Sequence, residues 1–474
     1  MIADLKPYAE YRASRSPWLG NIPVHWKLPR LGSVLCERKE TNEKRQIEQV
    51  LSVMKRIGVI RYEDKGNIGN KKSEDTGRYK IVRPDDIVVN CMNVIIGSVG
   101  RSQYTGCLSP VYYVLTRRDE TNNPRYMAAV FATKSFHESL VRIGNGILAH
   151  RMRIPMELLK CEPFPVPPPV EQDSIVRFLS WANGRLDRAI RAKRKVITLL
   201  NEQKQAIIHR AVTRGLDPSV PLKPSGIPWL GDIPQSNKRT KLGRICISVR
   251  DGTHNPPPAL PGIHRLLSVR NIVNGKFVVR DDDRTMLPSA FAELQRSYTV
   301  ERGDVVVAIV GATTGKSAVV GDMQNVTVQR SLAILRPNPT IIDGDYLGLL
   351  ISSQIIQRQI KQIMDKYAAQ PGIYLNELSG LQALYPSLRD QASIVSFVQA
   401  STEPLVTAIN RIEREIDLLR EYRTRLVADV VTGKLDVREA AAKLPAEEQA
   451  NELGEELVED NSEMIEDEIT EPVG

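Results

Sequence analysis

Residues 304–317, DVVVAIVGATTGKS, are the first candidates for chemistry, because an apolar run leads into a glycine turn that ends in Gly-Lys-Ser. A phosphate-binding loop needs Gly, four residues and then Gly-Lys-Ser/Thr, so that successive backbone N–H groups surround the phosphates. Only three residues separate Gly311 from Gly315, and the matching stretch of the first half, residues 93–98, contains no lysine. We therefore predict a strand–turn–strand in which glycine supplies a positive φ, and no nucleotide site.

A second candidate is HNPPPAL, residues 254–260, which partly resembles the Asn/Asp-Pro-Pro-aromatic motif of amino-methyltransferases. In that motif a polar side chain holds the target amine while the aromatic ring stacks on a flipped base. Here Pro258 stands where the aromatic residue belongs, and no glycine-rich methyl-donor loop accompanies it. We do not expect this chain to transfer methyl groups.

Nuclease and metal chemistry also lack the residues they need. Pro84-Asp85-Asp86 has no downstream acid-x-Lys to complete a nuclease site, and it matches Arg302-Gly303-Asp304 in the second half. Asp86 and Asp304 are therefore predicted to begin strands after a turn. The six histidines and five cysteines show no metal-ligand spacing. We expect no catalytic, cofactor or metal site in this chain.

Charge indicates a polyanionic partner. The last 31 residues hold twelve acids and no Lys or Arg, which leaves 65 basic and 44 acidic residues, or +21, on the rest. A basic body favours nucleic acid, although a solvated basic surface is the alternative. No apolar run approaches a membrane span and the N-terminus lacks a signal-peptide stretch, so the expected location is the cytoplasm.

The chain contains an internal repeat, which outweighs any single motif. Five pairs of segments match in the same order with an offset that drifts only from 211 to 219 residues. The pairs are Trp18–Pro23 with Trp229–Pro234, 31–32 with 242–243, 83–89 with 301–307, 174–178 with 393–397, and 211–217 with 430–436. This pattern predicts a tandem duplication.

Each half has two parts. Short β-type runs punctuated by Gly, Pro and Asn come first, and they are followed by about 40 residues with a helical period. The predicted fold class is α+β (mixed α/β), with two tandem-repeated domains separated by two long antiparallel coiled-coil helices in a pseudo-two-fold arrangement. The predicted boundaries are domain 1 at 1–165, helical spacer 1 at 166–217, a linker at 218–232, domain 2 at 233–385, helical spacer 2 at 386–436, and an acidic tail at 437–474.

The helical segments carry apolar residues in heptads, which predict that the two helices pack on each other; the alternative is that each packs on its own domain. Lys193 interrupts the first seam and Arg423 the second. The predicted interface residues are Leu179, Leu186, Ile190, Ile197, Leu200 and Ile207 in the first helix, and Val398, Leu405, Ile409, Ile412, Ile416, Leu419 and Leu426 in the second.

This layout resembles the specificity subunit of type I restriction–modification systems. SPWLGNIPVHW, SGIPWLGDIP, GDVVVAIVGATTGKSAVV and the helix ends VTRGLD and VTGKLD carry the resemblance, which covers residues 8–436. It implies two target-recognition domains that each contact half of a bipartite DNA site, and helical spacers that dock two methyltransferase (modification) subunits. It also implies restriction subunits, and S-adenosylmethionine, ATP and Mg as cofactors of those partners for adenine-N6 methylation and ATP-driven cleavage.

Contacts to bases favour Arg or Lys on guanine and Asn or Gln on adenine, with other cations on phosphates. The halves differ most at residues 51–80 and 267–291, where only Leu-Ser-Val is shared. The DNA-binding candidates in domain 1 are Lys55, Arg56, Lys71, Lys72, Arg78 and Arg101. Those in domain 2 are Arg250, His254, Arg270, Asn271, Lys316, Gln329 and Arg330, among which Gln329-Arg330 and Arg270-Asn271 are preferred.

Two features depart from the family pattern. Trp26 has Asn237 as its counterpart, and the acidic tail is either a solubilising segment or a DNA mimic that covers the basic surface. Two other hypotheses stay open: a free-standing sequence-specific DNA-binding regulator, and an enzyme whose site these motifs do not reveal.

Overall fold

The computed structural model describes residues 5–55, 57–66, 71–146, 152–227, 229–366 and 372–445. These residues form two compact units. Unit 1 comprises residues 1–193 and 414–474, and unit 2 comprises residues 194–413. Both long helices therefore begin in one unit and end in the other. Arg56 and residues 446–474 of the predicted acidic tail lie outside the described residues.

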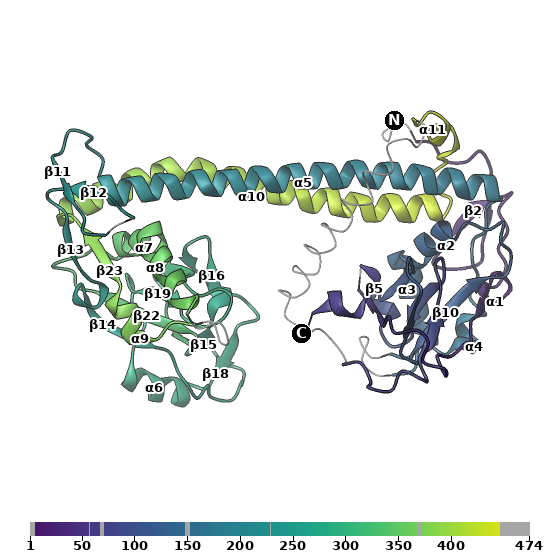
Figure 1. Cartoon of the computed structure of the whole chain (residues 1–474), viewed down its shortest axis with the longest axis horizontal. Helices are drawn as coiled ribbons and strands as arrows, with labels where there is room; N and C mark the ends of the chain where they lie inside the picture. The colour runs from purple at the N-terminus through teal and green to yellow at the C-terminus, as the bar shows by residue number, and fades with distance from the viewer. Residues whose placement is uncertain are drawn as a thin grey trace. The chain divides into compact units, whose positions relative to one another are not determined.

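An antiparallel four-stranded sheet forms the centre of unit 1 (Figure 1). Its strands lie in the order β3 (Leu35–Glu37), β10 (Tyr112–Arg117), β7 (Ile87–Asn90) and β8 (Val99–Arg101). Every residue of β7 is buried, which is why this strand reads as an unbroken apolar run. Three strand pairs flank the sheet: β1 (Tyr11–Ala13) with β2 (Asn21–Pro23), β4 (Leu51–Met54) with β5 (Gly58–Arg61), and β6 (Lys80–Val82) with β9 (Gly106–Leu108).

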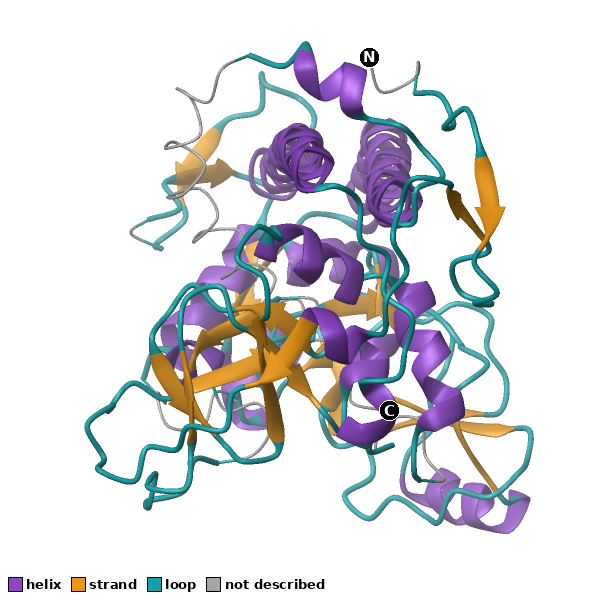
Figure 2. Ribbon diagram, turned by 90° about the vertical axis from the view of Figure 1, so that its right-hand side faces the viewer, coloured by secondary structure: helices purple, strands orange, loops and turns teal. Residues whose placement is uncertain are grey.

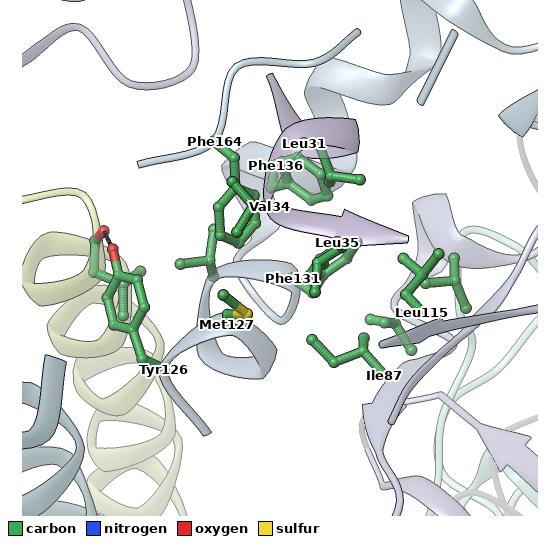
Figure 3. Close-up of a cluster of buried hydrophobic side chains, with 14 of the residues drawn as sticks. Leu31, Val34, Leu35, Ile87, Leu115, Tyr126, Met127, Phe131, Phe136 and Phe164 are labelled. Carbon is green, nitrogen blue, oxygen red and sulfur yellow. Dashed lines mark hydrogen bonds between the residues drawn. The ribbon is translucent and has the colours of Figure 1, made fainter. Parts of the chain in front are cut away.

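Short helices pack around this sheet: α1 (Leu31–Val34), α2 (Pro124–Phe131), α3 (Lys134–Ser139) and α4 (Met156–Leu159). Near the end of the chain, α11 (Arg438–Ala442) adds Ala441 to the same apolar core. Figure 3 shows Met127 and Phe131 of α2 packed with the strand residues Leu35, Ile87 and Leu115.

The sheet of unit 2 contains an equivalent set of strands with two more at its edge. The order is β14 (Cys246–Asp251), β22 (Leu332–Pro337), β19 (Val305–Ala308), β20 (Ser317–Val319), β17 (Lys276–Phe277) and β16 (Ile272–Val273). A separate three-stranded sheet has the order β18 (Arg284–Met286), β15 (His264–Leu267), β21 (Val326–Val328). Two further strand pairs are β11 (Leu222–Pro224) with β12 (Asp232–Pro234), and β13 (Lys238–Lys241) with β23 (Gln382–Tyr385). The helices are α6 (Pro288–Ser297), α7 (Gly344–Ser352), α8 (Gln354–Met364) and α9 (Leu375–Gly380).

Hydrogen-bond registers confirm the duplication residue by residue. Ile87 faces Leu115 in unit 1, and Val305 faces Leu335 in unit 2, so the central strand keeps the 218-residue offset of Asp86 and Asp304 and its partner strand has an offset of 220. Tyr11 faces Pro23, and Leu222 faces Pro234, which reproduces the offset of 211. The two units therefore share one scaffold.

Two long helices, α5 (Pro169–Arg214) and α10 (Leu388–Val431), contain 46 and 44 residues, or about 69 and 66 Å at 1.5 Å per residue. The prolines that precede α5 suit a helix start, because the first turn has no partners for its N–H groups. Gly215 and Gly433, both with positive φ, follow the two C-termini, where a left-handed residue ends a helix.

The long helices pack together in both units, as predicted (Figures 1 and 2). In unit 1, Phe178 and Leu179 near the start of α5 share a core with Leu426 and Val430 near the end of α10. In unit 2, the end of α5 shares a core with the start of α10, through Ile208, Ala211 and Val212 with Ile394, Val395 and Val398. Within each unit the two helices are therefore antiparallel.

Candidate nucleic-acid interface

A buried aspartate anchors one end of the central strand in each sheet. Asp86 precedes β7 and accepts hydrogen bonds from Nε and Nη2 of Arg38, each at 2.9 Å. Asp304 precedes β19 and accepts from Nε of Arg336 at 3.0 Å and from its Nη2 at 2.9 Å. Each carboxylate also accepts from a backbone N–H three residues earlier, which closes a turn. The prediction that Asp86 and Asp304 begin strands after a turn is confirmed.

The two arginines come from different strands. Arg38 follows β3, and its register position is held in unit 2 by Arg250 of β14, because Arg250 faces Ile334 as Arg38 faces Val114. Arg336, by contrast, lies on β22 at the position of Thr116 in unit 1. Because Arg336 pairs with Asp304, Arg250 is not needed as its partner. The Nη1 of Arg250 donates instead to the carbonyl of Ser297 at 3.2 Å.

At the other end of the central strand lies the glycine turn that resembled a nucleotide loop. Gly311 and Gly315 have φ values of 86° and 91°, and β20 follows the turn and pairs antiparallel with β19. The predicted strand–turn–strand is confirmed, and a strand stands where a phosphate-binding loop would begin a helix. Gly97 holds the position of Gly315 in unit 1, also with positive φ.

This end of the unit 2 sheet brings several predicted DNA-binding residues together. The Arg330 N–H donates to the Thr253 carbonyl at 3.0 Å, which places the Gln329–Arg330 turn against the loop that carries His254. The N–H of Ile309 donates to the Ser331 carbonyl at 2.9 Å, so the turn that carries Lys316 lies at the same end. Within the described ranges, the side chains of Arg330 and Lys316 are exposed and form no ion pair. His254 contacts Asp251 at 2.6 Å.

Arg270 and Asn271 have a different role. Asn271 is 0% exposed, its amide nitrogen donates to the Val278 carbonyl and to Asp283, and its oxygen accepts the N–H of Ser268 at 2.8 Å. The prediction that Asn271 contacts a base is wrong, because burial and these bonds use the whole amide. Arg270 pairs with both Asp282 (2.7 Å) and Asp283 (2.8 Å), so it braces the same loop.

In unit 1 the candidates divide between two places. Lys71, Lys72 and Arg78 are exposed on one loop, where the N–H of Lys72 donates to the Tyr62 hydroxyl at 3.0 Å. Lys55 lies at the turn between β4 and β5, at the far end of that hairpin from Tyr62. Arg101 on β8 pairs with Asp85 at 2.7 Å. As a set, these residues remain predictions for DNA contacts.

The predicted helix-interface residues lie on the sides of α5 and α10 that turn inward. Leu179, Leu186, Ile190, Val398, Ile409, Ile416 and Leu426 are buried, and Ile197, Leu200, Ile207, Leu405, Ile412 and Leu419 are half-buried. Lys193 and Arg423, which interrupt the two heptad seams, both form ion pairs with the opposite helix.

Sequence reasoning missed the residues that fasten each domain to its long helix. Gln172 of α5 is fully buried; its oxygen accepts the N–H of Asn123, the N-cap of α2, at 2.8 Å. Gln391 of α10 accepts the N–H of Asp343, the N-cap of α7, also at 2.8 Å. Both amides donate to the carbonyl of a proline just before the helix. The signal was present, because Gln172 and Gln391 are separated by the same 219 residues as the matched Ser-Ile-Val segments.

A further network is special to unit 1. Glu171, beside Gln172, accepts hydrogen bonds from the Tyr8 hydroxyl (2.6 Å), the Trp26 indole (2.8 Å) and His25 (2.8 Å). In unit 2, Asp390 replaces Glu171 and Asn237 replaces Trp26, so this part of the domain entry differs, as the sequence departure indicated.

In the part of the chain that the structure describes, no three His, Cys, Asp or Glu side chains are grouped to hold a metal ion. Likewise, none of the described helices combines the length and the apolar character that a membrane span requires.

No protein-family model matches the chain. It is 23% identical over 434 residues to the type I restriction enzyme EcoBI specificity subunit of Escherichia coli, a match that covers 83% of this chain and 87% of that protein. A solved structure that describes complex assembly and conformational transition of the type I restriction–modification system contains a chain of similar fold, with a TM-score of 0.56 and 15% identity over 87% of this chain and 99% of that one. The HsdS subunit from Thermoanaerobacter tengcongensis gives a TM-score of 0.38 and 14% identity over 88% of this chain and 98% of that one. Over most of its length the chain is thus similar in sequence to the specificity subunit of a type I restriction enzyme, and it shares its fold with a chain of a type I restriction–modification system.

Proposed function

We propose that each unit recognises one half of a bipartite, asymmetric DNA site. The observation that carries this proposal is the pairing of one shared scaffold with two unlike sets of loops. The central strands and their buried aspartates match in register, whereas Lys71, Lys72 and Arg78 have no counterparts among His254, Lys316 and Arg330. A shared scaffold with different contact residues suits a protein that recognises two different half-sites on one duplex.

The long helices supply the distance between the half-sites in this proposal. Each runs without interruption from one unit into the other, and about 69 Å of helix is about twice the 34 Å repeat of a DNA groove. The buried joints at Gln172 and Gln391 support this role, because a spacer determines a distance only if each domain is held firmly to it.

The proposed partners are double-stranded DNA, two methyltransferase (modification) subunits and restriction subunits, in the cytoplasm. S-adenosylmethionine, ATP and Mg would serve those subunits in adenine-N6 methylation and ATP-driven cleavage. The exposed flanks of α5 and α10 are the proposed docking surface for the methyltransferase subunits.

Sequencing of methylated bases tests the proposal. The chain is expressed with its methyltransferase subunits, and the methylated sites are expected to form one split motif. Exchange of residues 233–385 for those of a relative is expected to change one half of the motif, and exchange of residues 1–165 to change the other. A change in both halves after either exchange would contradict the proposal. Specific DNA binding by the chain alone, with no effect of the methyltransferase subunits, would instead favour the free-standing regulator.

A further inference from the structure

Two charged residues stand in the apolar seams between α5 and α10, and each meets an opposite charge on the other helix. Nζ of Lys193 lies 2.5 Å from Oε2 of Glu415. Arg423 forms an ion pair with Asp187. All four residues belong to unit 1. We call Asp187–Arg423 and Lys193–Glu415 the crossed pairs, because the acid is on α5 in one and on α10 in the other.

These pairs are partly withdrawn from water, so mismatching them is costly. The side chain of Asp187 is 16% exposed and that of Arg423 is 29% exposed, while Lys193 and Glu415 are 32% and 36% exposed. Their neighbours along the seams, Leu186, Ile190 and Ile416, are buried. A charged group at such a position stabilises one alignment of two helices and penalises alignments that leave it against apolar residues.

The heptad pattern alone would tolerate a shift of seven residues, since apolar residues recur at that interval. A shift in one direction would place Val430 opposite Asp187 and Tyr422 opposite Lys193. A shift in the other direction would place Ile416 opposite Asp187 and Ala408 opposite Lys193. Both ion pairs would be lost in either case.

The crossed polarity adds repulsion to that loss. In the first shifted alignment, Lys193 would lie opposite Tyr422, the neighbour of Arg423 along α10. In the second, Asp187 would lie opposite Ile416, the neighbour of Glu415 along α10. Like charges would thus meet in both directions, which is how charge patterns discriminate against competing registers.

We propose that the crossed pairs are positioning residues that fix the register of α5 on α10, and thereby the number of base pairs between the two half-sites. This inference rests on the proposed function, but it assigns spacing, not base recognition, to these four residues. A shift of seven residues moves one helix about 10 Å along the other, which corresponds to about three base pairs of DNA.

Two charge inversions of the full-length chain, co-expressed with its methyltransferase subunits, separate register from simple stability. The first inverts one pair, Asp187→Arg with Arg423→Asp. This variant can still form the ion pair between positions 187 and 423 in the native alignment. In both shifted alignments, however, the charges that repelled each other in the wild type become opposite charges that attract. The second also inverts Lys193→Glu and Glu415→Lys, which restores the crossed pattern and serves as the matched control.

Sequencing of methylated DNA is the main measurement. The single-pair inversion is expected to methylate sites whose halves are unchanged but whose spacer differs by about three base pairs, with at least a tenfold loss at the original spacer. The four-residue inversion is expected to keep the original spacer. The same spacer in both variants, or the same loss in both, would overturn the inference.

A second measurement keeps the test independent of the methylation result. Spin labels at Ser180 and Leu418, both exposed and both in unit 1, report the position of α5 along α10. We expect a second distance, changed by up to about 10 Å, in the single-pair inversion only. If the wild-type complex methylates no split motif, the proposed function fails, yet this distance still decides whether the crossed pairs fix the register. A single, unchanged distance in the single-pair inversion would refute it.

Discussion

The two units use the same sheet and hold it in place with different side chains. In unit 1 the buried aspartate pairs with an arginine that follows β3, and in unit 2 with an arginine on β22. Beside the glycine turn, His137 donates to the Phe131 carbonyl at 2.5 Å, while Gln357 donates to the Ile351 carbonyl at 2.8 Å. At each of these positions the scaffold thus requires a chemical property, such as a positive charge or a hydrogen-bond donor, and not one particular residue type. Such freedom lets two halves of a duplicated protein diverge without loss of fold.

The buried aspartates are the place where this comparison is most easily broken. Asp86→Ala and Asp304→Ala are each expected to cost up to about 3–5 kcal/mol of stability, because each removes the buried carboxylate and leaves the arginine only its more exposed partner, Glu40 or Glu301. Thermal unfolding of the full-length variants measures the effect. Arg336→Thr is expected to cost less than Arg38→Ala, since Arg250 occupies the register position from which Arg38 pairs with the aspartate of unit 1. Equal losses would show that the two arginine positions are not interchangeable.

The glutamine joints provide a test in which the units should behave alike. Gln172→Ala and Gln391→Ala each leave a partly buried helix-cap N–H and a buried proline carbonyl without this partner, at an expected cost of about 1–3 kcal/mol apiece. Hydrogen exchange at α2 and α7 should rise in the matching unit only. Gln172→Glu keeps the acceptor but places a buried carboxylate beside the Pro167 carbonyl and the Asn122 side-chain oxygen, so it should lose at least as much stability as Ala.

A pair of arginines in unit 2 separates DNA contact from structure. Arg330→Ala is expected to weaken DNA binding by the complex. If Arg330 contacts a phosphate, the slope of log K against log salt concentration should fall by about one unit. If it contacts a base, discrimination at that one base pair should fall by about 1–3 kcal/mol. Arg270→Ala should instead lower the unfolding temperature, because Arg270 braces Asp282 and Asp283. DNA titration at several salt concentrations, with melting curves for both variants, measures this. If Arg270→Ala weakened DNA binding and Arg330→Ala only lowered the unfolding temperature, the exposed turn would not face DNA.

The smallest expected effect concerns acid sensitivity. Burial holds the pKa of His137 below its usual value of about 6.5, so the folded unit prefers the neutral ring. The unfolded chain binds a proton as pH falls below 6.5 and the folded unit does not, so His137 lowers the free energy of unfolding between about pH 6.5 and its lowered pKa. His137→Gln copies Gln357 of unit 2 and should reduce the loss of stability between pH 7 and pH 5. An unchanged pH profile would mean that His137 carries no such effect.

Much of the architecture follows from the sequence, because duplication and heptads are patterns that a single chain displays. The interruptions of the seams at Lys193 and Arg423 were also visible, but their partners were not, since pairing across two helices depends on a register that sequence spacing does not determine. Asn271 was misjudged for a related reason. A polar residue beside a strand can contact a base or can hold a loop in place through hydrogen bonds, and the sequence does not distinguish the two. The positions of Val278 and Asp283, which Asn271 contacts, decide between them.

The core of unit 1 is assembled from both ends of the chain, with Val430 and Val437 packed beside residues near the N-terminus such as Tyr8 and Trp26. Unit 2 draws on one continuous stretch, residues 194–413. During synthesis on the ribosome, unit 2 therefore has all its residues first, while the earlier-made part of unit 1 waits for the final segment. Nascent chains that stop before residue 414 should expose the apolar surface of α2 and α5, which would make them targets for chaperones and proteases.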